Sequence, residues 1–122
     1  MLQIILHDII IKFMYTYEAK ITKVTDGDTV HADINLGFGV ILRDTILRLY
    51  GINAPEMKGE SASLGKASKD RLESLVLGKT VTLKTFKDKR EKYGRLLAQI
   101  WLEGSSINDA LVTEGFAKTY IL

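Results

Sequence analysis

The chain has 122 residues, of which 46% are hydrophobic and 26% are charged, and its formal net charge is +2. This length fits a single folded domain, and the composition excludes a disordered tail. The chain has no Cys, and its two His residues, His7 and His31, are far apart in sequence. Disulfides, thiolate metal sites and His-rich metal clusters are therefore excluded, and any bound metal is expected to have oxygen ligands.

Residues 1–14 form an apolar extension of undecided role, ahead of a single folded domain that we expect at residues 15–122. The extension carries Asp8 in its middle and has neither a basic start nor a small-residue cleavage site, so it is a weak candidate for a signal peptide. A start codon upstream of Met14 explains it equally well. Because about 20 apolar residues are needed to span a bilayer, no membrane partner is expected. Secretion and a cytoplasmic location both stay open.

Hydrophobic patterning predicts three strands in the first half of the domain, over residues 17–25, 29–36 and 40–52. Asp26-Gly27-Asp28 joins the first two strands and Gly37-Phe38-Gly39 joins the next two. Both connections have the residues that tight turns require.

The second half predicts two helices and two further strands. A helix over residues 61–77 ends at Gly78, strands cover residues 80–86 and 96–102, and a second helix begins at Ser106 and ends at Gly115. The element order indicates an α+β fold, a five-stranded OB-fold Greek-key β-barrel with two or so packed helices. The apolar side of the first helix is predicted to consist of Leu64, Ala67, Leu72, Leu75 and Val76.

Two stretches offer candidate ligands for an ion or a phosphate. Asp26-Gly27-Asp28-Thr29 is by itself a typical hairpin turn, but a second carboxylate at Asp28 suits a hard cation. Arg48 lies between apolar neighbours, and a partly buried guanidinium needs a carboxylate or a phosphate. It is therefore either half of a structural ion pair, with Asp44 or Glu18 as partner, or a phosphate ligand.

Pro55 is expected to end strand pairing, because it has no N–H to donate. The Ala54 carbonyl is then available for a ligand, with the Asn53 amide and the Glu56 carboxylate on either side of it. These residues add oxygen donors next to Arg48 in sequence.

A third stretch, Glu91 to Arg95, reads alone as a basic turn in which Gly94 gives backbone freedom. It closes a segment with six cations and two carboxylates, which suits a polyanionic partner, although a solvated hairpin has the same composition. The cations are Lys84, Lys87, Lys89, Arg90, Lys92 and Arg95. Taken together, two arginines, an acidic metal site and a carboxylate are the groups that phosphodiester hydrolysis requires.

Four ordered motifs with compatible gaps stand along the chain: Val-Thr-Asp-Gly-Asp-Thr-Val at residues 24–30, Arg-Leu-Tyr-Gly-Ile-Asn-Ala-Pro-Glu at 48–56, Lys-Tyr-Gly-Arg at 92–95, and Asn-Asp-Ala-Leu-Val-Thr-Glu-Gly-Phe-Ala at 108–117. With them the chain resembles the staphylococcal nuclease (thermonuclease) family from about Tyr17 to Tyr120. The resemblance implies an OB barrel and a calcium-dependent endonuclease, a monomer that hydrolyses DNA and RNA with little sequence preference.

The resemblance also implies roles for single residues. The calcium ligands would be Asp28, Asn53 and the Ala54 carbonyl, with Asp26 and Thr29 behind them. The scissile phosphate would be bound by Arg48 and Arg95, and the attacking water by Glu56, with the 5′ oxygen as leaving group. Single-stranded or frayed nucleic acid would be contacted by Lys92, Tyr93 and Lys89.

Three departures from the family pattern change these expectations. Asn53 stands where the best-known members have Asp, so calcium affinity is expected to fall with the lost charge. A nucleotide-facing Tyr of longer members falls on Ile121, and their third helix is absent. The connection from Gly37 to Asp44 is longer. A catalytically weak or inactive nucleic-acid-binding barrel is the main alternative, and a structural barrel without nucleic acid is a third reading.

Overall fold

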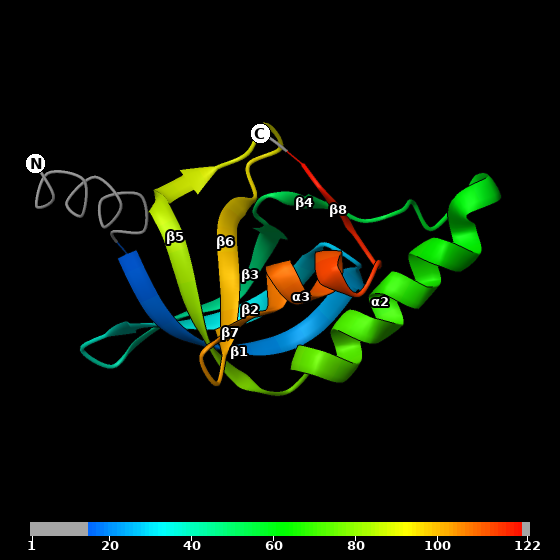
Figure 1. Cartoon of the computed structure of the whole chain (residues 1–122). Coiled ribbons are helices and arrows are strands. Elements are labelled where there is room, and N and C mark those ends of the chain that lie inside the picture. The colour runs from blue at the N-terminus through cyan, green and yellow to red at the C-terminus, as the bar shows by residue number, and fades with distance from the viewer. Residues whose placement is uncertain (1–14, 121–122) are drawn as a thin grey trace, which may run out of the picture.

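A computed structural model describes residues 15–120, so the predicted extension at residues 1–14 and the position of Ile121 lie outside the described residues. Its centre is a barrel of five strands (Figure 1). The strands are β1 (Tyr15–Asp26), β2 (Thr29–Gly37), β3 (Val40–Leu49), β5 (Thr80–Arg90) and β6 (Leu96–Leu102).

The sheet order β3-β2-β1-β5-β6 is antiparallel throughout, and a parallel pairing of β3 with β6 closes it. This is the order of an OB-fold barrel, so the predicted fold is confirmed. Short strands complete the picture: β4 (Ile52–Asn53) pairs with β8 (Lys118–Thr119), and β7 (Ser105–Ser106) pairs with the end of β6.

The helices follow their predicted caps. A 3₁₀ turn, η1 (Gly59–Ser61), leads into α2 (Ala62–Val76), and Gly78 follows it with a φ of +76° that favours glycine. In α3 (Ile107–Thr113) the Ser106 hydroxyl accepts a hydrogen bond from the Asp109 N–H, as a capping residue does. Within residues 15–120, no helix has the length and apolar character needed to cross a membrane.

The core fills the barrel and the space under the two helices. Buried residues alternate with more exposed ones along parts of β1 and β2, whereas β3 ends and β6 begins with three consecutive buried residues. The helices α2 and α3 add apolar side chains from one face each. Fully buried members with large side chains are Ile21, Leu47, Leu49, Leu72, Leu83, Ile100 and Leu111.

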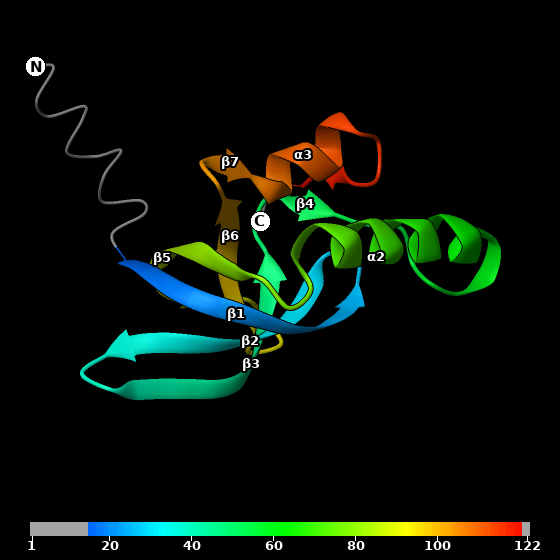
Figure 2. The same ribbon diagram turned by 90° about the horizontal axis from the view of Figure 1, so that it is seen from below.

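The predicted apolar side of α2 is wrong in its first half. Leu64 is 63% exposed and Ala67 is also exposed, because the N-terminal half of α2 reaches beyond the barrel, on the side away from the protruding β2–β3 hairpin (Figures 1 and 2). The buried positions of this helix are instead Gly65, Ser68, Leu72 and Val76.

The predicted single strand at residues 40–52 is also wrong, since it divides into β3 and β4. Gly51 has a φ of +81°, which a strand cannot contain, and the chain turns there. The Tyr50 N–H donates to the Ala98 carbonyl of β6 at 2.8 Å. This turn directs the chain after β3 across the end of the barrel, toward the residues with candidate chemistry.

A buried side-chain amide holds the turn between β3 and β4 in place. Asn108 of α3 is 1% exposed, and its amide donates to the carbonyls of Tyr50 at 2.9 Å and Ala98 at 3.3 Å. Its oxygen accepts from the Ile100 N–H at 3.1 Å. Each of these buried groups would cost about 1–3 kcal/mol if left unpaired. One side chain thus joins α3, β6 and the β3–β4 turn.

Candidate functional site

One cleft with a volume of about 1010 Å³ brings the sequence-predicted residues together. Every predicted site residue except Thr29 lines it, although these residues come from four separate stretches of the chain. Those lining it are Asp26, Asp28, Arg48, Asn53, Ala54, Glu56, Lys89, Lys92, Tyr93 and Arg95. Their grouping follows from the fold, while their individual roles remain predictions.

The Asp26 to Thr29 turn is held against α2 and the β4 region by close packing. A Cβ added to Gly27 would lie 2.6 Å from the Ser68 Cβ and 2.7 Å from the Ala54 Cβ. Gly27 is not among the glycines with positive φ, so backbone freedom does not account for a glycine here. It is required because three segments approach each other too closely for any side chain.

A second glycine lets α2 touch the segment that carries Glu56. A Cβ on Gly65 would lie 2.4 Å from the Glu56 carbonyl oxygen and 2.8 Å from that of Pro55. The Ser61 hydroxyl also donates to the Glu56 carbonyl, at 2.8 Å. The helix therefore holds the backbone of Glu56 while its side chain remains exposed at the cleft.

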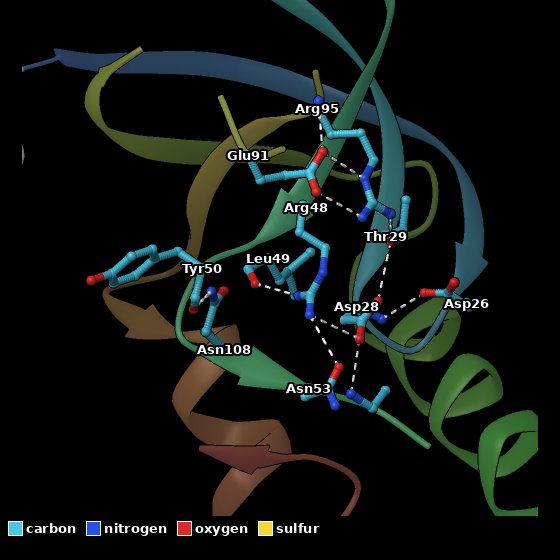
Figure 3. A network of polar contacts seen from close by, with 11 residues as sticks. Asp26, Asp28, Thr29, Arg48, Leu49, Tyr50, Asn53, Glu91, Arg95 and Asn108 are labelled. Carbon is cyan, nitrogen blue, oxygen red and sulfur yellow. Dashed lines mark hydrogen bonds and ion pairs between the residues drawn. The ribbon is translucent and has the colours of Figure 1, made fainter. Parts of the chain in front are cut away.

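Asp28 is 8% exposed and lies at the centre of a polar network (Figure 3). Its Oδ2 accepts from the Ala54 N–H at 2.8 Å and faces Arg48 Nη2 at 3.4 Å, and its Oδ1 accepts from the Thr29 hydroxyl at 3.2 Å. Burial raises the pKa of Asp28 to about 6, and the neighbouring Asp26 carboxyl adds to the rise. The Ala54 N–H and the Arg48 charge oppose this shift but do not overcome it.

Arg48 is 7% exposed and pairs with Asp28, not with Asp44 or Glu18 as the ion-pair reading expected. Its Nη1 donates to the Leu49 carbonyl at 2.7 Å, and its Nη2 donates to Asn53 Oδ1 at 3.2 Å (Figure 3). A guanidinium has five N–H donors, so three contacts leave it able to bind phosphate oxygens as well.

Arg95 is fixed by Glu91, a residue to which the sequence reading gave no separate role. The Arg95 Nε donates to Glu91 Oε1 and its Nη2 to Oε2, both at 3.1 Å, while Nη1 reaches the Thr29 hydroxyl at 3.3 Å. Glu91 also accepts from the N–H groups of Tyr93 and Arg95. The Arg95 hydrogen bonds lower the pKa of Glu91 to about 2, so it stays ionised. The four-residue spacing of the two charges was the available signal.

The basic segment divides between two surfaces. Lys89, Arg90 and Lys92 line the cleft, and the Lys92 ammonium lies 5.0 Å from the centroid of the Tyr93 ring. Lys84 instead lies over the Trp101 ring at 4.1 Å and does not line the cleft. The cleft rim is therefore cationic, as a site for a polyanion requires.

The oxygens of the site fit a hard cation. Asp28 Oδ2 and Asn53 Oδ1 both lie next to Arg48 Nη2. The Ala54 N–H donates a hydrogen bond to Asp28 Oδ2. A bound cation would reduce the repulsion between the neighbouring Asp26 and Asp28 carboxyls, of which Asp28 has a raised pKa. In residues 15–120, no three His, Cys, Asp or Glu side chains form a metal-ligating group. The fit therefore depends on an amide and a carbonyl beside Asp28.

The barrel and the cleft define a class of OB-fold proteins in which two arginines, Arg48 and Arg95, line one cleft. Residues 46–122 match the family described as staphylococcal nuclease homologue, and the chain belongs to that family. The predicted family is thereby confirmed.

Three relatives show the range of similarity. The chain is 33% identical over 116 residues to endonuclease YhcR of Bacillus subtilis, a match covering 87% of the chain and 9% of the relative. It is 36% identical over 103 residues to an uncharacterized endonuclease of Escherichia coli O157:H7, covering 83% and 60%. It is 29% identical over 102 residues to the thermonuclease of Staphylococcus hyicus, covering 81% and 57%. The chain thus spans no more than about three fifths of these relatives.

The close approach of α2 predicts an unusual response to Gly65→Ala. Helix propensity alone would stabilise the protein by about 1 kcal/mol, but a methyl group against the Glu56 carbonyl is expected to destabilise it by about 1–3 kcal/mol. Urea denaturation measures the sign. Ser63→Ala, an exposed change in the same helix, is the control and should stay within about 0.5 kcal/mol of wild type. Stabilisation by Gly65→Ala would contradict the packing argument.

The raised pKa of Asp28 predicts a pH-dependent stability in calcium-free buffer. The folded protein favours the protonated form of the Asp28 carboxyl. The contribution of this group to the free energy of unfolding is therefore present below about pH 4 and is lost as the pH rises toward 6. The free energy of unfolding of Asp28→Asn should therefore increase relative to that of wild type as the pH rises from 4 to 7.

The same shift can be measured directly by carbon-detected NMR of the carboxyl groups. Asp28 should titrate near pH 6. Asp33 is the internal control, because the N–H of Asp44 lowers the pKa of Asp33. If Asp28 titrated as low as Asp33, burial would not dominate its environment.

Proposed function

We propose that this protein is a calcium-dependent phosphodiesterase that hydrolyses DNA and RNA with little sequence specificity. The observation that carries the proposal is the presence of two fixed guanidinium groups, Arg48 and Arg95, on one cleft with Asp28 and Glu56. Similarity to proteins named endonuclease and thermonuclease supports a nuclease. Nucleic acid is the substrate class that the cationic rim favours.

The two arginines would bind the scissile phosphate and stabilise the extra negative charge of the transition state. Each is held before substrate arrives, Arg48 by Asp28 and the Leu49 carbonyl, Arg95 by Glu91. Donors that are fixed in advance need no reorganisation as charge develops. Glu91 accepts from Nε and Nη2 on one edge of the Arg95 guanidinium, while Nη1 is directed toward Thr29, next to Asp28.

Glu56 would activate the water. Its carboxylate would take a proton as the water oxygen attacks phosphorus, the bond from phosphorus to the 5′ oxygen would break, and the leaving oxygen would take a proton from solvent. An exposed carboxylate at the cleft can exchange that proton with solvent after each turnover.

The ligands of the calcium ion would be Asp28, Asn53 and the Ala54 carbonyl. When bound, the ion would supply positive charge that screens and polarises the phosphate. Asp26 accepts from the Asp28 N–H at 3.0 Å and Thr29 donates to the Asp28 carboxylate, so both would orient this ligand without contacting the metal.

A nucleic-acid-binding barrel without activity is the second candidate, and Asn53 is the observation that favours it. Its neutral amide leaves the proposed metal site with one negative charge fewer than a second aspartate would give. We propose that the enzyme is a monomer and acts on single-stranded or frayed DNA and RNA. The two candidate functions differ only in whether the bound nucleic acid is cleaved.

Hydrolysis of single-stranded DNA across a calcium titration tests the proposal. Activity should require calcium and vanish with a chelator. Arg95→Ala should lower kcat about 10²- to 10³-fold with a much smaller change in binding, and Glu56→Gln should lower it strongly as well. Glu60→Gln removes a nearby exposed carboxylate that does not line the cleft and should retain wild-type activity. DNA binding without cleavage at millimolar calcium would instead favour the inactive barrel.

The charge of residue 53 should set the calcium affinity. Asn53→Asp is expected to tighten calcium binding, because it returns a carboxylate to the ligand set. Isothermal titration calorimetry of the wild-type protein and the variant measures the affinity directly, without turnover. An unchanged dissociation constant would show that residue 53 is not a ligand.

A further inference from the structure

The turn at the tip of the protruding β2–β3 hairpin carries a side chain that the fold does not use (Figure 2). Phe38 is 106% exposed, and its φ of +54° lies in the left-handed region, as do the φ values of Gly37 and Gly39 on either side. This conformation is strained for a bulky side chain, whereas glycine and asparagine adopt it readily. A strained and fully exposed phenylalanine adds nothing to the core. Its presence indicates a contact with something outside the domain.

The strands that lead to this turn are apolar without interruption. Residues 36–42 include no polar side chain, and five of them are exposed apolar residues: Leu36, Phe38, Val40, Ile41 and Leu42. Successive residues of a strand point to opposite faces, so Ile41 lies on one face of the hairpin and Val40 and Leu42 lie on the other. The tip is therefore apolar on both faces. A flat protein surface would cover only one face, whereas a lipid layer surrounds a tip that enters it.

Charged side chains begin at the same level on both strands. Arg43 Nη1 lies 3.1 Å from Asp33 Oδ2, and Asp33 Oδ1 accepts from the Asp44 N–H at 2.9 Å. Val40 and Arg43 are three residues apart, which is about 10 Å at the rise of a strand. Segments that lie on a bilayer bury their apolar groups about 5–10 Å into the boundary between headgroups and acyl chains. The apolar tip has the length of such an insertion, and the ion pair marks its limit.

The backbone of the tip fits the headgroup region and not the hydrocarbon core. β3 pairs with β6 only at residues 47–49, so within residues 15–120 no strand is paired with the outer edge of residues 40–42. Open strand edges do not occur in the hydrocarbon core, but among the headgroups water can hydrate them. The expectation of no membrane partner concerned a spanning segment, and a shallow insertion requires none.

We propose that the tip of the β2–β3 hairpin, residues 36–42, is a wedge that inserts into the headgroup region of a lipid bilayer. The inference does not depend on the proposed nuclease function.

The wedge also sets the position of the cleft relative to the bilayer. β2 begins at Thr29, beside Asp28 of the cleft, and ends at Gly37 of the tip. Its nine residues span about 25–30 Å. Surface charge is screened over about 10 Å at 0.1 M salt. The cleft of a membrane-bound molecule would therefore stay accessible to a polyanion, even above a negatively charged bilayer.

Co-sedimentation of the full chain with phosphatidylcholine vesicles tests the wedge. Wild type should bind, and Phe38→Asn should lower the partition coefficient at least about tenfold, because it removes the most exposed apolar side chain of the tip. Asparagine tolerates the left-handed conformation, so the thermal midpoint of this variant should not fall, and a loss of folding cannot explain weaker binding. Leu64→Gln is the matched control. Leu64 is 63% exposed on α2, on the side away from the hairpin, and its replacement should leave vesicle binding unchanged.

A fluorescent reporter locates the inserted residue. Phe38→Trp should show a blue-shifted emission with vesicles and quenching by lipids that carry bromine near the headgroup end of the acyl chains. Leu64→Trp should show neither effect. The single native tryptophan, Trp101, is present in both variants, so the spectrum of wild type is subtracted. An emission of Phe38→Trp that does not change on binding would contradict insertion of the tip.

Three further outcomes would overturn the proposal. The first is a wild-type protein that does not bind vesicles. The second is vesicle binding that survives in Phe38→Asn but is lost when residues 1–14 are removed, which would assign the membrane contact to that segment. The third is a wild-type dimer and a monomeric Phe38→Asn in sedimentation equilibrium, which would make the tip an interface between two copies of the chain.

Discussion

The buried contact between Arg48 and Asp28 is the interaction on which the site depends. Both residues are less than 9% exposed, and neither charge would be tolerated there alone. Asp28 directly precedes β2 and Arg48 lies near the end of β3, where Thr29 of β2 is paired with Arg48. The same carboxylate accepts the Ala54 N–H, so it also fixes the segment after β4. One pair of charges thus joins the three segments that carry the site.

Close packing sets the spacing that these charges then use. At Gly27 and Gly65, α2 approaches the backbone so closely that a single methyl group does not fit. The helix therefore acts as a rigid spacer between the Asp28 turn and the segment with Glu56. Asn108 does the same from the other side, where it ties the β3–β4 turn to β6 through hydrogen bonds. The polar residues of the cleft are held by groups that have no part in the chemistry.

Local sequence signals predicted the barrel and the members of the cleft, because strand alternation, turn residues and caps are encoded within a few residues. These local signals do not predict contacts between residues that are far apart in the chain. The partner of Arg48 is twenty residues away along the chain, just before the adjacent strand β2, and the exposure of Leu64 depends on how far α2 extends past the barrel. The turn at Gly27 was predicted, but the need for a glycine there was not, since it comes from the close approach of Ser68 and Ala54. The sequence predicted Tyr50 within a strand, whereas in the structure it precedes the turn at Gly51 and lines the cleft.

The neutral amide at position 53 gives the metal-free site a different balance of charge. Arg48 Nη2 faces Asp28 on one side and Asn53 Oδ1 on the other, so one guanidinium meets one carboxylate and one dipole. A second carboxylate at position 53 would add repulsion among Asp26, Asp28 and residue 53, where burial already raises the pKa of Asp28. Asparagine keeps the oxygen and avoids that repulsion.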